Sequence, residues 1–126
     1  MINDNEEIWV KINNNLIIDD YLISNKGHIK RISSNYIYKD FCNNKYAYIS
    51  VSLKCKDGKR RRYRVNRLVA QTFIPNPNNY PVVDHIDENP QNNNVENLRW
   101  CTYQQNTNFY LENKKKRLMN EISKGD

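Results

Sequence analysis

Carboxylate, imidazole and amide side chains recur along one stretch of the chain, which runs from Asp84 and His85 through Asn97 to Asn106. An imidazole has a free pKa of ~6.5, so it can be neutral at working pH and take a proton from water. Carboxylate and amide oxygens are among the hard ligands that Mg²⁺ and Mn²⁺ prefer. If the fold brings these groups to one point, they have the chemistry for metal-assisted hydrolysis.

The sequence around these residues predicts a strand, a loop, a second strand and a helix. The apolar run at residues 80–83 is typical of a β-strand that ends at His85, and an Asn-rich loop suited to turns follows it. Residues 98–102 predict the second strand. The four residues from Thr102 have the form of a capping box, which begins a helix and places Asn106 in its first turn, facing the hairpin.

This series of elements resembles the HNH nucleases, and in particular the homing-type endonucleases of phages and large viruses. The similar segments are residues 67–77, 84–87 and 95–102, followed by Asn106. They occur in the order that the family has, so the resemblance does not depend on a single short motif. It implies an α+β chain in which a small N-terminal β-rich module precedes a ββα-metal (HNH) nuclease unit.

The resemblance also implies a role for each residue of the stretch. His85 would be the base that activates water, and Asp84 and Asn106 would hold one divalent cation, Mg²⁺ or Mn²⁺. Asn97 would be the second catalytic residue, whose amide ties the loop and helps to fix the backbone and ring of His85. The implied activity is hydrolysis of DNA phosphodiester bonds, and a monomer with one metal site would nick one strand.

One position of the loop departs from the family, because the usual Asp-Gly-Asn has Glu88 in place of its Gly here. If the backbone at Glu88 has a positive φ, we expect strain on the order of 1 kcal/mol. Its carboxylate, close to Asp84 and Asp87, could also repel phosphate or shift the metal. The alternative function is therefore a catalytically silent DNA-binding protein that retains the fold. An RNA-binding or ribonuclease role would use the same charges.

A basic strand adjoins this unit. Residues 47–55 alternate apolar and polar, an Asp-Gly turn follows, and residues 60–65 predict the return strand of a hairpin. Because alternate residues of a strand share a face, Arg60, Arg62 and Arg64 line one side, and we call these three residues the basic ladder. We expect the ladder to contact double-stranded DNA. The alternative is an edge strand that uses charge against aggregation.

The overall charge agrees with a polyanionic partner. The chain has 20 Lys and Arg against 14 Asp and Glu, a formal net charge of +6. Such an excess suits DNA, although basic charge alone can also serve solubility. Further candidates for DNA contact, outside the basic ladder, are Lys30, Arg31 and Arg99.

The predicted organisation has three parts. Residues 1–46 resemble the NUMOD-type module that often precedes HNH domains, and within them residues 21–32 predict a hairpin whose Gly is free to take a positive φ. Residues 47–113 form the nuclease domain, in which residues 65–74 predict a helix packed beneath the catalytic hairpin. Residues 114–126 are a basic tail.

Composition limits the class of protein. The hydrophobic content of 38% in 126 residues is enough for a modest core. No apolar run approaches the ~20 residues of a membrane span, and the acidic start does not resemble a signal peptide. We therefore expect a soluble, intracellular protein of a phage- or virus-infected host cell, without a membrane or an obligate protein partner. Three cysteines without a Cys-x-x-Cys pair predict free thiols and no structural zinc.

Overall fold

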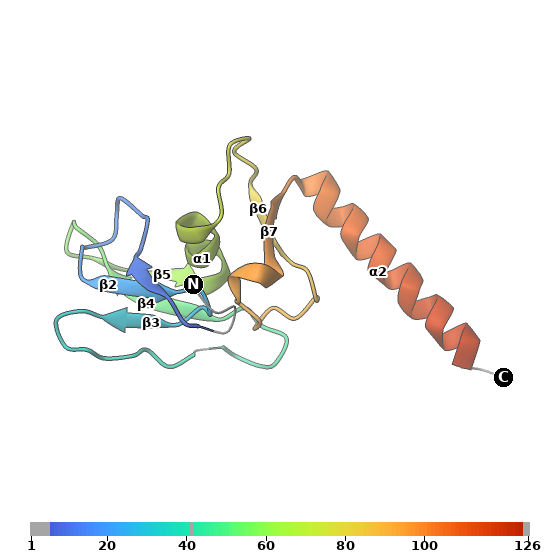
Figure 1. Cartoon of the computed structure of the whole chain (residues 1–126), viewed down its shortest axis with the longest axis horizontal. Helices are drawn as coiled ribbons and strands as arrows, with labels where there is room; N and C mark the ends of the chain where they lie inside the picture. Colours follow the sequence, from blue (N-terminus) through green and yellow to red (C-terminus); the bar gives the residue numbers. More distant parts are fainter. Residues whose placement is uncertain (1–5, 41, 125–126) are drawn as a thin grey trace.

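The computed structural model describes residues 6–40 and 42–124. Residues 1–5 of the acidic start and the last two residues of the predicted tail lie outside these ranges. The architecture is mixed α+β, as predicted (Figure 1). The elements are β1 (Trp9–Lys11), β2 (Tyr21–Ser24), β3 (Ile29–Arg31), β4 (Ser50–Lys54), β5 (Arg60–Arg64), α1 (Val65–Phe73), β6 (Val82–His85), the 3₁₀ turn η1 (Val95–Asn97), β7 (Leu98–Cys101) and α2 (Tyr103–Lys124).

Strands β1, β2 and β3 form an antiparallel sheet in that order. The predicted hairpin within it is confirmed, with Tyr21 opposite Arg31. Gly27 in the β2–β3 turn has a φ of +85°, a conformation that only glycine adopts without strain. The inward side chains of β2 are fully buried, because Tyr21 is 1% exposed and Ile23 is 0% exposed.

Strands β4 and β5 form the second hairpin, with the predicted turn and with Ser50 opposite Arg64. Val51 and Leu53 of β4 are buried on one side. The basic ladder lies on the other side, where Ser52 is opposite Arg62. All three ladder residues are exposed, as the alternation predicts.

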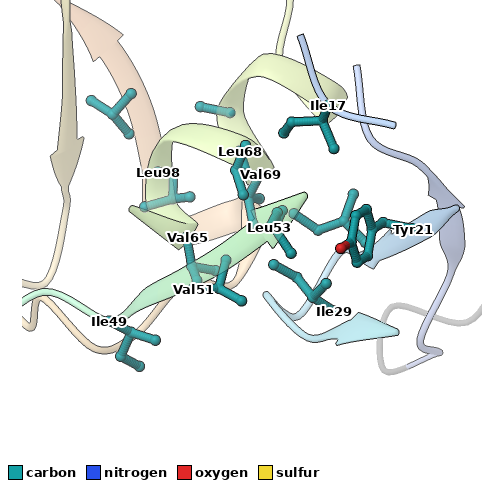
Figure 2. Packing of buried hydrophobic residues seen from close by; sticks show 13 residues of the cluster. Ile17, Tyr21, Ile29, Ile49, Val51, Leu53, Val65, Leu68, Val69 and Leu98 are labelled. Carbon is teal, nitrogen blue, oxygen red and sulfur yellow. The ribbon is translucent and has the colours of Figure 1, made fainter. Parts of the chain in front are cut away.

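Helix α1 follows β5 directly and is the centre of the core. It buries Leu68, Val69 and Ala70. It ends before Pro75, as the sequence predicts. The buried cluster around it combines side chains of β4, the N-terminal sheet and β7 (Figure 2). A β-bridge between Ile17 and Cys55 adds a backbone link between the first two predicted parts. These parts therefore share one core and do not pack as separate bodies.

Strands β6 and β7 form the third hairpin, and α2 follows it and projects away from the body (Figure 1). The helix continues through residue 113 to Lys124, so the predicted start of a basic tail has no counterpart in the secondary structure. The basic run of residues 114–117 is one exposed part of this helix. None of the described helices is long and apolar enough to cross a membrane.

Candidate active site

The β6–β7 hairpin positions Asp84 and His85 at the end that leads into its connecting loop. Asp84 lies opposite Arg99, and His85 lies opposite Leu98. Both side chains line a cleft of about 340 Å³, to which α2 contributes Asn106. Strand β6 and helix α2 therefore bring three of the predicted site residues to one cleft.

The ring of His85 is buried and held by one hydrogen bond. His85 is 7% exposed, and its Nε2–H donates to Oδ1 of Asn93 at 2.9 Å. Since an amide oxygen can only accept, this bond leaves the lone pair of the neutral ring on Nδ1. The ring of Tyr48 lies beside it, with 5.8 Å between ring centroids. The ring is thus held directly by Asn93 and not by the expected Asn97, whose side chain is directed toward the turn at residues 87–92.

Asn97 ties that turn together. Its Oδ1 accepts from the Asp87 N–H at 3.0 Å, and its Nδ2 donates both to Asp87 Oδ1 and to the Asn92 carbonyl at 2.9 Å. Its own carbonyl accepts from the Ile86 N–H at 2.8 Å. The side chain thus closes the loop between the two strands, and this loop begins at the backbone of His85.

The Asp87 carboxylate is the acceptor at the centre of the turn. Partial burial raises the pKa of this carboxyl group, but the effect is outweighed by hydrogen bonds from Asn92 Nδ2, the Asn89 N–H and Asn97 Nδ2. The net result is a pKa below the ordinary value of 3.8. A charged carboxylate therefore organises the turn next to the cleft.

Asp84 forms an ion pair across the hairpin. Its Oδ2 accepts from Arg99 Nε at 2.9 Å, and the Asp84 side chain is 17% exposed. The guanidinium of Arg99 also stacks on Phe109 of α2, 3.5 Å from the ring centroid. Arg99, predicted as a DNA contact, is therefore engaged by the hairpin and by the helix.

The predicted capping box is confirmed and begins α2. The Thr102 N–H donates to Gln105 Oε1 at 2.9 Å, and the Gln105 N–H donates to Thr102 Oγ1 at 3.1 Å. These bonds satisfy donors that a helix N-terminus leaves without partners. They fix the first turn, and this turn carries Asn106 into the cleft.

Glu88 also lines the cleft, and its backbone has a positive φ. The φ is +64°, so the condition for strain is met. Its Oε2 accepts from Arg117 Nη1 of α2 at 2.6 Å. The carboxylate thus connects the β6–β7 loop to the basic run of α2, a contact that the sequence did not reveal.

Apart from Arg99, the predicted DNA contacts belong to two sheets, the β4–β5 hairpin and the N-terminal sheet. Arg64, at the end of the basic ladder, stacks on Tyr48 with 4.2 Å to the ring centroid, so the ladder reaches the edge of the cleft. In the N-terminal sheet, Lys30 lies 4.4 Å from the ring centroid of Trp9. Arg31 is paired with the carboxylate of Asp20, the residue just before β2, at 2.9 Å.

The oxygen donors of the cleft determine which metal ion it could hold. Within residues 6–40 and 42–124, no three His, Cys, Asp or Glu side chains gather into a possible metal site. The cleft instead has a mixed donor set, with the carboxylate of Asp84 and the amide of Asn106. Such neutral and anionic oxygens suit a hard cation, so the residues present fit Mg²⁺ or Mn²⁺.

Comparisons with known proteins agree with this arrangement. A family model of HNH endonucleases matches residues 63–108, which include all the residues of the cleft from Val82 to Asn106. An uncharacterized HNH endonuclease of Acanthamoeba polyphaga mimivirus is 37% identical over 99 residues, covering 78% of this chain and 29% of the relative. The DNA endonuclease I-HmuI of Bacillus phage SP01 is 36% identical over 104 residues, covering 82% of this chain and 56% of the relative.

A solved structure extends the likeness to almost the whole chain. The HNH homing endonuclease I-HmuI, a protein that binds and cleaves DNA, superposes with a TM-score of 0.71 at 30% identity. The match covers 93% of this chain and 68% of that chain. The chain spans about a quarter to about half of the length of the curated relatives that it matches, 29% and 56% for the two above. With its ββα unit and these matches, the chain belongs to the HNH endonuclease family.

Proposed function

We propose that this protein is a metal-dependent DNA endonuclease of the homing type, which hydrolyses phosphodiester bonds and nicks one strand. The observation that carries the proposal is the shared cleft of Asp84, His85 and Asn106. We also propose that residues 1–46 form a NUMOD-type module that precedes residues 47–113, the nuclease domain.

His85 is the general base in this proposal. Its Nε2–H is committed to Asn93, so Nδ1 carries the lone pair that takes the proton from the attacking water. Burial of the ring on Tyr48 and the hydrogen bond to Asn93 restrict its rotation, which keeps Nδ1 directed for proton transfer. Asn97 acts through the loop backbone and is a positioning residue.

Asp84 and Asn106 would hold the cation, through a carboxylate oxygen and the amide oxygen. Because Arg99 donates to Oδ2 of Asp84, Oδ1 is the oxygen proposed as the ligand. When bound, Mg²⁺ or Mn²⁺ supplies positive charge at the scissile phosphate and the leaving oxygen. Arg99 neutralises the rest of the Asp84 charge and orients the carboxylate, while the capping box keeps Asn106 at the cleft.

The DNA backbone would approach along the basic ladder. Its exposed guanidinium groups end at Tyr48, which also lines the cleft, so a bound duplex could place a phosphate near His85. Lys30 and Arg31 of the N-terminal sheet are proposed as further contacts, and Arg99 as a contact from within the site.

The experiment is incubation of the pure protein with supercoiled plasmid in Mg²⁺, Mn²⁺ or EDTA, beside His85→Ala and His28→Gln. The expected result is open-circle product that requires a metal and disappears with His85→Ala. The matched control is His28→Gln, which removes the other of the two histidines and should still cut. Plasmid that is retarded on a gel but remains uncut with every metal would refute the proposed nuclease activity.

The alternative is a catalytically silent DNA-binding protein, and one observation favours it. Glu88 adds a second carboxylate to the wall of the cleft, where a phosphate would have to bind. Its pairing with Arg117 offsets part of that charge. The alternative predicts salt-sensitive binding of duplex DNA without turnover, and nicking by the wild type would exclude it. If the wild type is silent, a gain of nicking by Glu88→Gly would identify Glu88 as the cause.

A further inference from the structure

The turn between β2 and β3 lies directly against the loop that holds His85. The Val95 N–H donates to the Asn25 carbonyl at 2.8 Å, which connects the turn to the loop through the backbone. Asn25 is itself fixed, because its Oδ1 accepts from the Ile8 N–H at 2.8 Å and its Nδ2 donates to the Glu6 carbonyl at 3.0 Å. The N-terminal sheet thus supports the loop from one side.

Gly27 makes the closest approach between the turn and the loop. A Cβ atom added at Gly27 would lie 2.7 Å from Cβ and 3.1 Å from the carbonyl oxygen of Asn93. Neither neighbour is the far end of a flexible side chain, so any side chain here would displace Asn93. The absence of a side chain at Gly27 therefore sets the position of Asn93.

Asn93 connects the β2–β3 turn to the catalytic ring. It is 4% exposed, and its Oδ1 accepts from Nε2–H of His85. An acceptor on one ring nitrogen decides both which tautomer is present and how the ring is rotated. A small displacement of Asn93 would weaken this hydrogen bond, and the ring of His85 could then change its tautomer and rotate.

We propose that the β2–β3 turn is part of the active site: Asn25 and Gly27 hold Asn93, and Asn93 holds His85 in its Nε2–H tautomer. All three are positioning residues that act through His85. The inference rests on the proposed function for the role of His85, but the position and tautomer of the ring can be measured without any cleavage. The N-terminal module thereby has a role in the chemistry that is separate from any contact with DNA.

The chain offers a matched control for Gly27. Gly58 in the β4–β5 turn has almost the same φ, +86° against +85°, but an added Cβ there meets nothing within 4 Å. Gly27→Ala and Gly58→Ala therefore carry the same backbone strain. Only Gly27→Ala pushes on Asn93.

The first readout is the ¹⁵N spectrum of the imidazole nitrogens with the rings neutral, which reports the tautomer directly. The chain has two histidines, so the signal of His85 is assigned with His85→Ala. We expect the wild type and Gly58→Ala to have the Nε2–H tautomer. Gly27→Ala and Asn93→Ala should have a mixture, and Asn93→Asp, which keeps the acceptor oxygen, should restore the wild-type form.

The second readout is the rate of plasmid nicking. We expect Gly27→Ala and Asn93→Ala to lower kcat by roughly 10- to 100-fold with little change in KM. Gly58→Ala should leave both unchanged. If Gly27→Ala does not fold, Asn25→Ala, which only removes the tethers to residues 6 and 8, should give a smaller loss in the same direction.

Two results would overturn the inference: the same tautomer in Gly27→Ala as in Gly58→Ala, or an equal loss of kcat in both. Failure of the proposed function is a different outcome. If the wild type cuts no DNA with any metal, the ¹⁵N spectra alone decide whether the turn positions the ring.

Discussion

Replacement of Glu88 tests the link between backbone conformation and stability in the β6–β7 loop. A non-glycine residue at a φ of +64° costs on the order of 1–2 kcal/mol, which glycine avoids. Glycine also loses more entropy on folding than alanine, by about 0.4–1 kcal/mol. The difference favours Glu88→Gly over Glu88→Ala by roughly 0.5–1 kcal/mol, the reverse of the order at ordinary positions.

Comparing Glu88→Gly with Glu88→Ala keeps the lost Glu88–Arg117 ion pair from affecting the difference in stability. Neither variant can pair with Arg117, whose side chain is 53% exposed, so this cost of about 0.2–1 kcal/mol cancels between them. Relative to the wild type, Glu88→Gly should therefore be nearly neutral. For a chain of this size the expected difference between the two variants is about 2–5 °C in Tm.

The assay is urea denaturation of both variants, with Glu112 of α2 as the control position. Glu112 is exposed in the middle of a helix, where alanine should be more stable than glycine by about 1 kcal/mol. The reasoning fails if alanine is at least as stable as glycine at position 88. It also fails if the two positions give the same order.

Three other predictions concern the surface and the ends of elements. Gln105→Ala should destabilise the fold by about 1 kcal/mol in urea and speed amide exchange in the first turn of α2, because half of the capping box is removed. Replacing the three residues of the basic ladder by Gln should weaken the salt dependence of duplex DNA binding. The slope of log K against log salt should fall in magnitude by ~0.9 for each phosphate that is no longer neutralised. The control is Arg61→Gln, which should change the slope little because Arg61 is paired with Asp57. Hydrogen bonds from Ser33, and then the pairing with Arg31, lower the pKa of Asp20 below its ordinary 3.8, so the carboxylate stabilises the fold above about pH 4. This contribution should disappear as the pH falls through the lowered pKa, and the urea midpoint of Asp20→Asn should fall less between pH 5 and pH 2 than that of the wild type.

The parts of the site that the sequence predicts are those set by local rules. Alternation and the apolar run specify β6 and β7, and the capping box specifies where α2 begins. Local propensity also carries the continuation of α2 beyond residue 113, since Glu, Lys, Arg, Leu and Met favour helices. The like charges of residues 114–117 favour a solvated tail, but helix propensity outweighs them and α2 continues through this segment.

Asn93 could not be identified in the same way. The loop between β6 and β7 contains five Asn, at positions 89, 92, 93, 94 and 97, and each can serve in turns by the same local hydrogen bonds. Which of them is directed toward His85 depends on the backbone of the whole loop. That backbone is set partly by the β2–β3 turn, which is more than 60 residues away in sequence, since Gly27 lies against Asn93.

The N-terminal module and the nuclease unit are therefore distinct as sequence motifs, but they do not have separate hydrophobic cores that would stabilise each one alone. A two-stranded hairpin such as β6–β7 is marginal by itself in water and depends on what it packs against. Its Val83 and Leu98 belong to the same buried cluster as Leu68 of α1, and this cluster continues into Ile23 of the N-terminal sheet. A catalytic residue must be held to about 0.5 Å, so the proposed role of His85 requires support that includes that sheet. Exchange of N-terminal modules between nucleases of this kind would then preserve chemistry only if the new module supplies both the apolar face and a glycine turn against the loop.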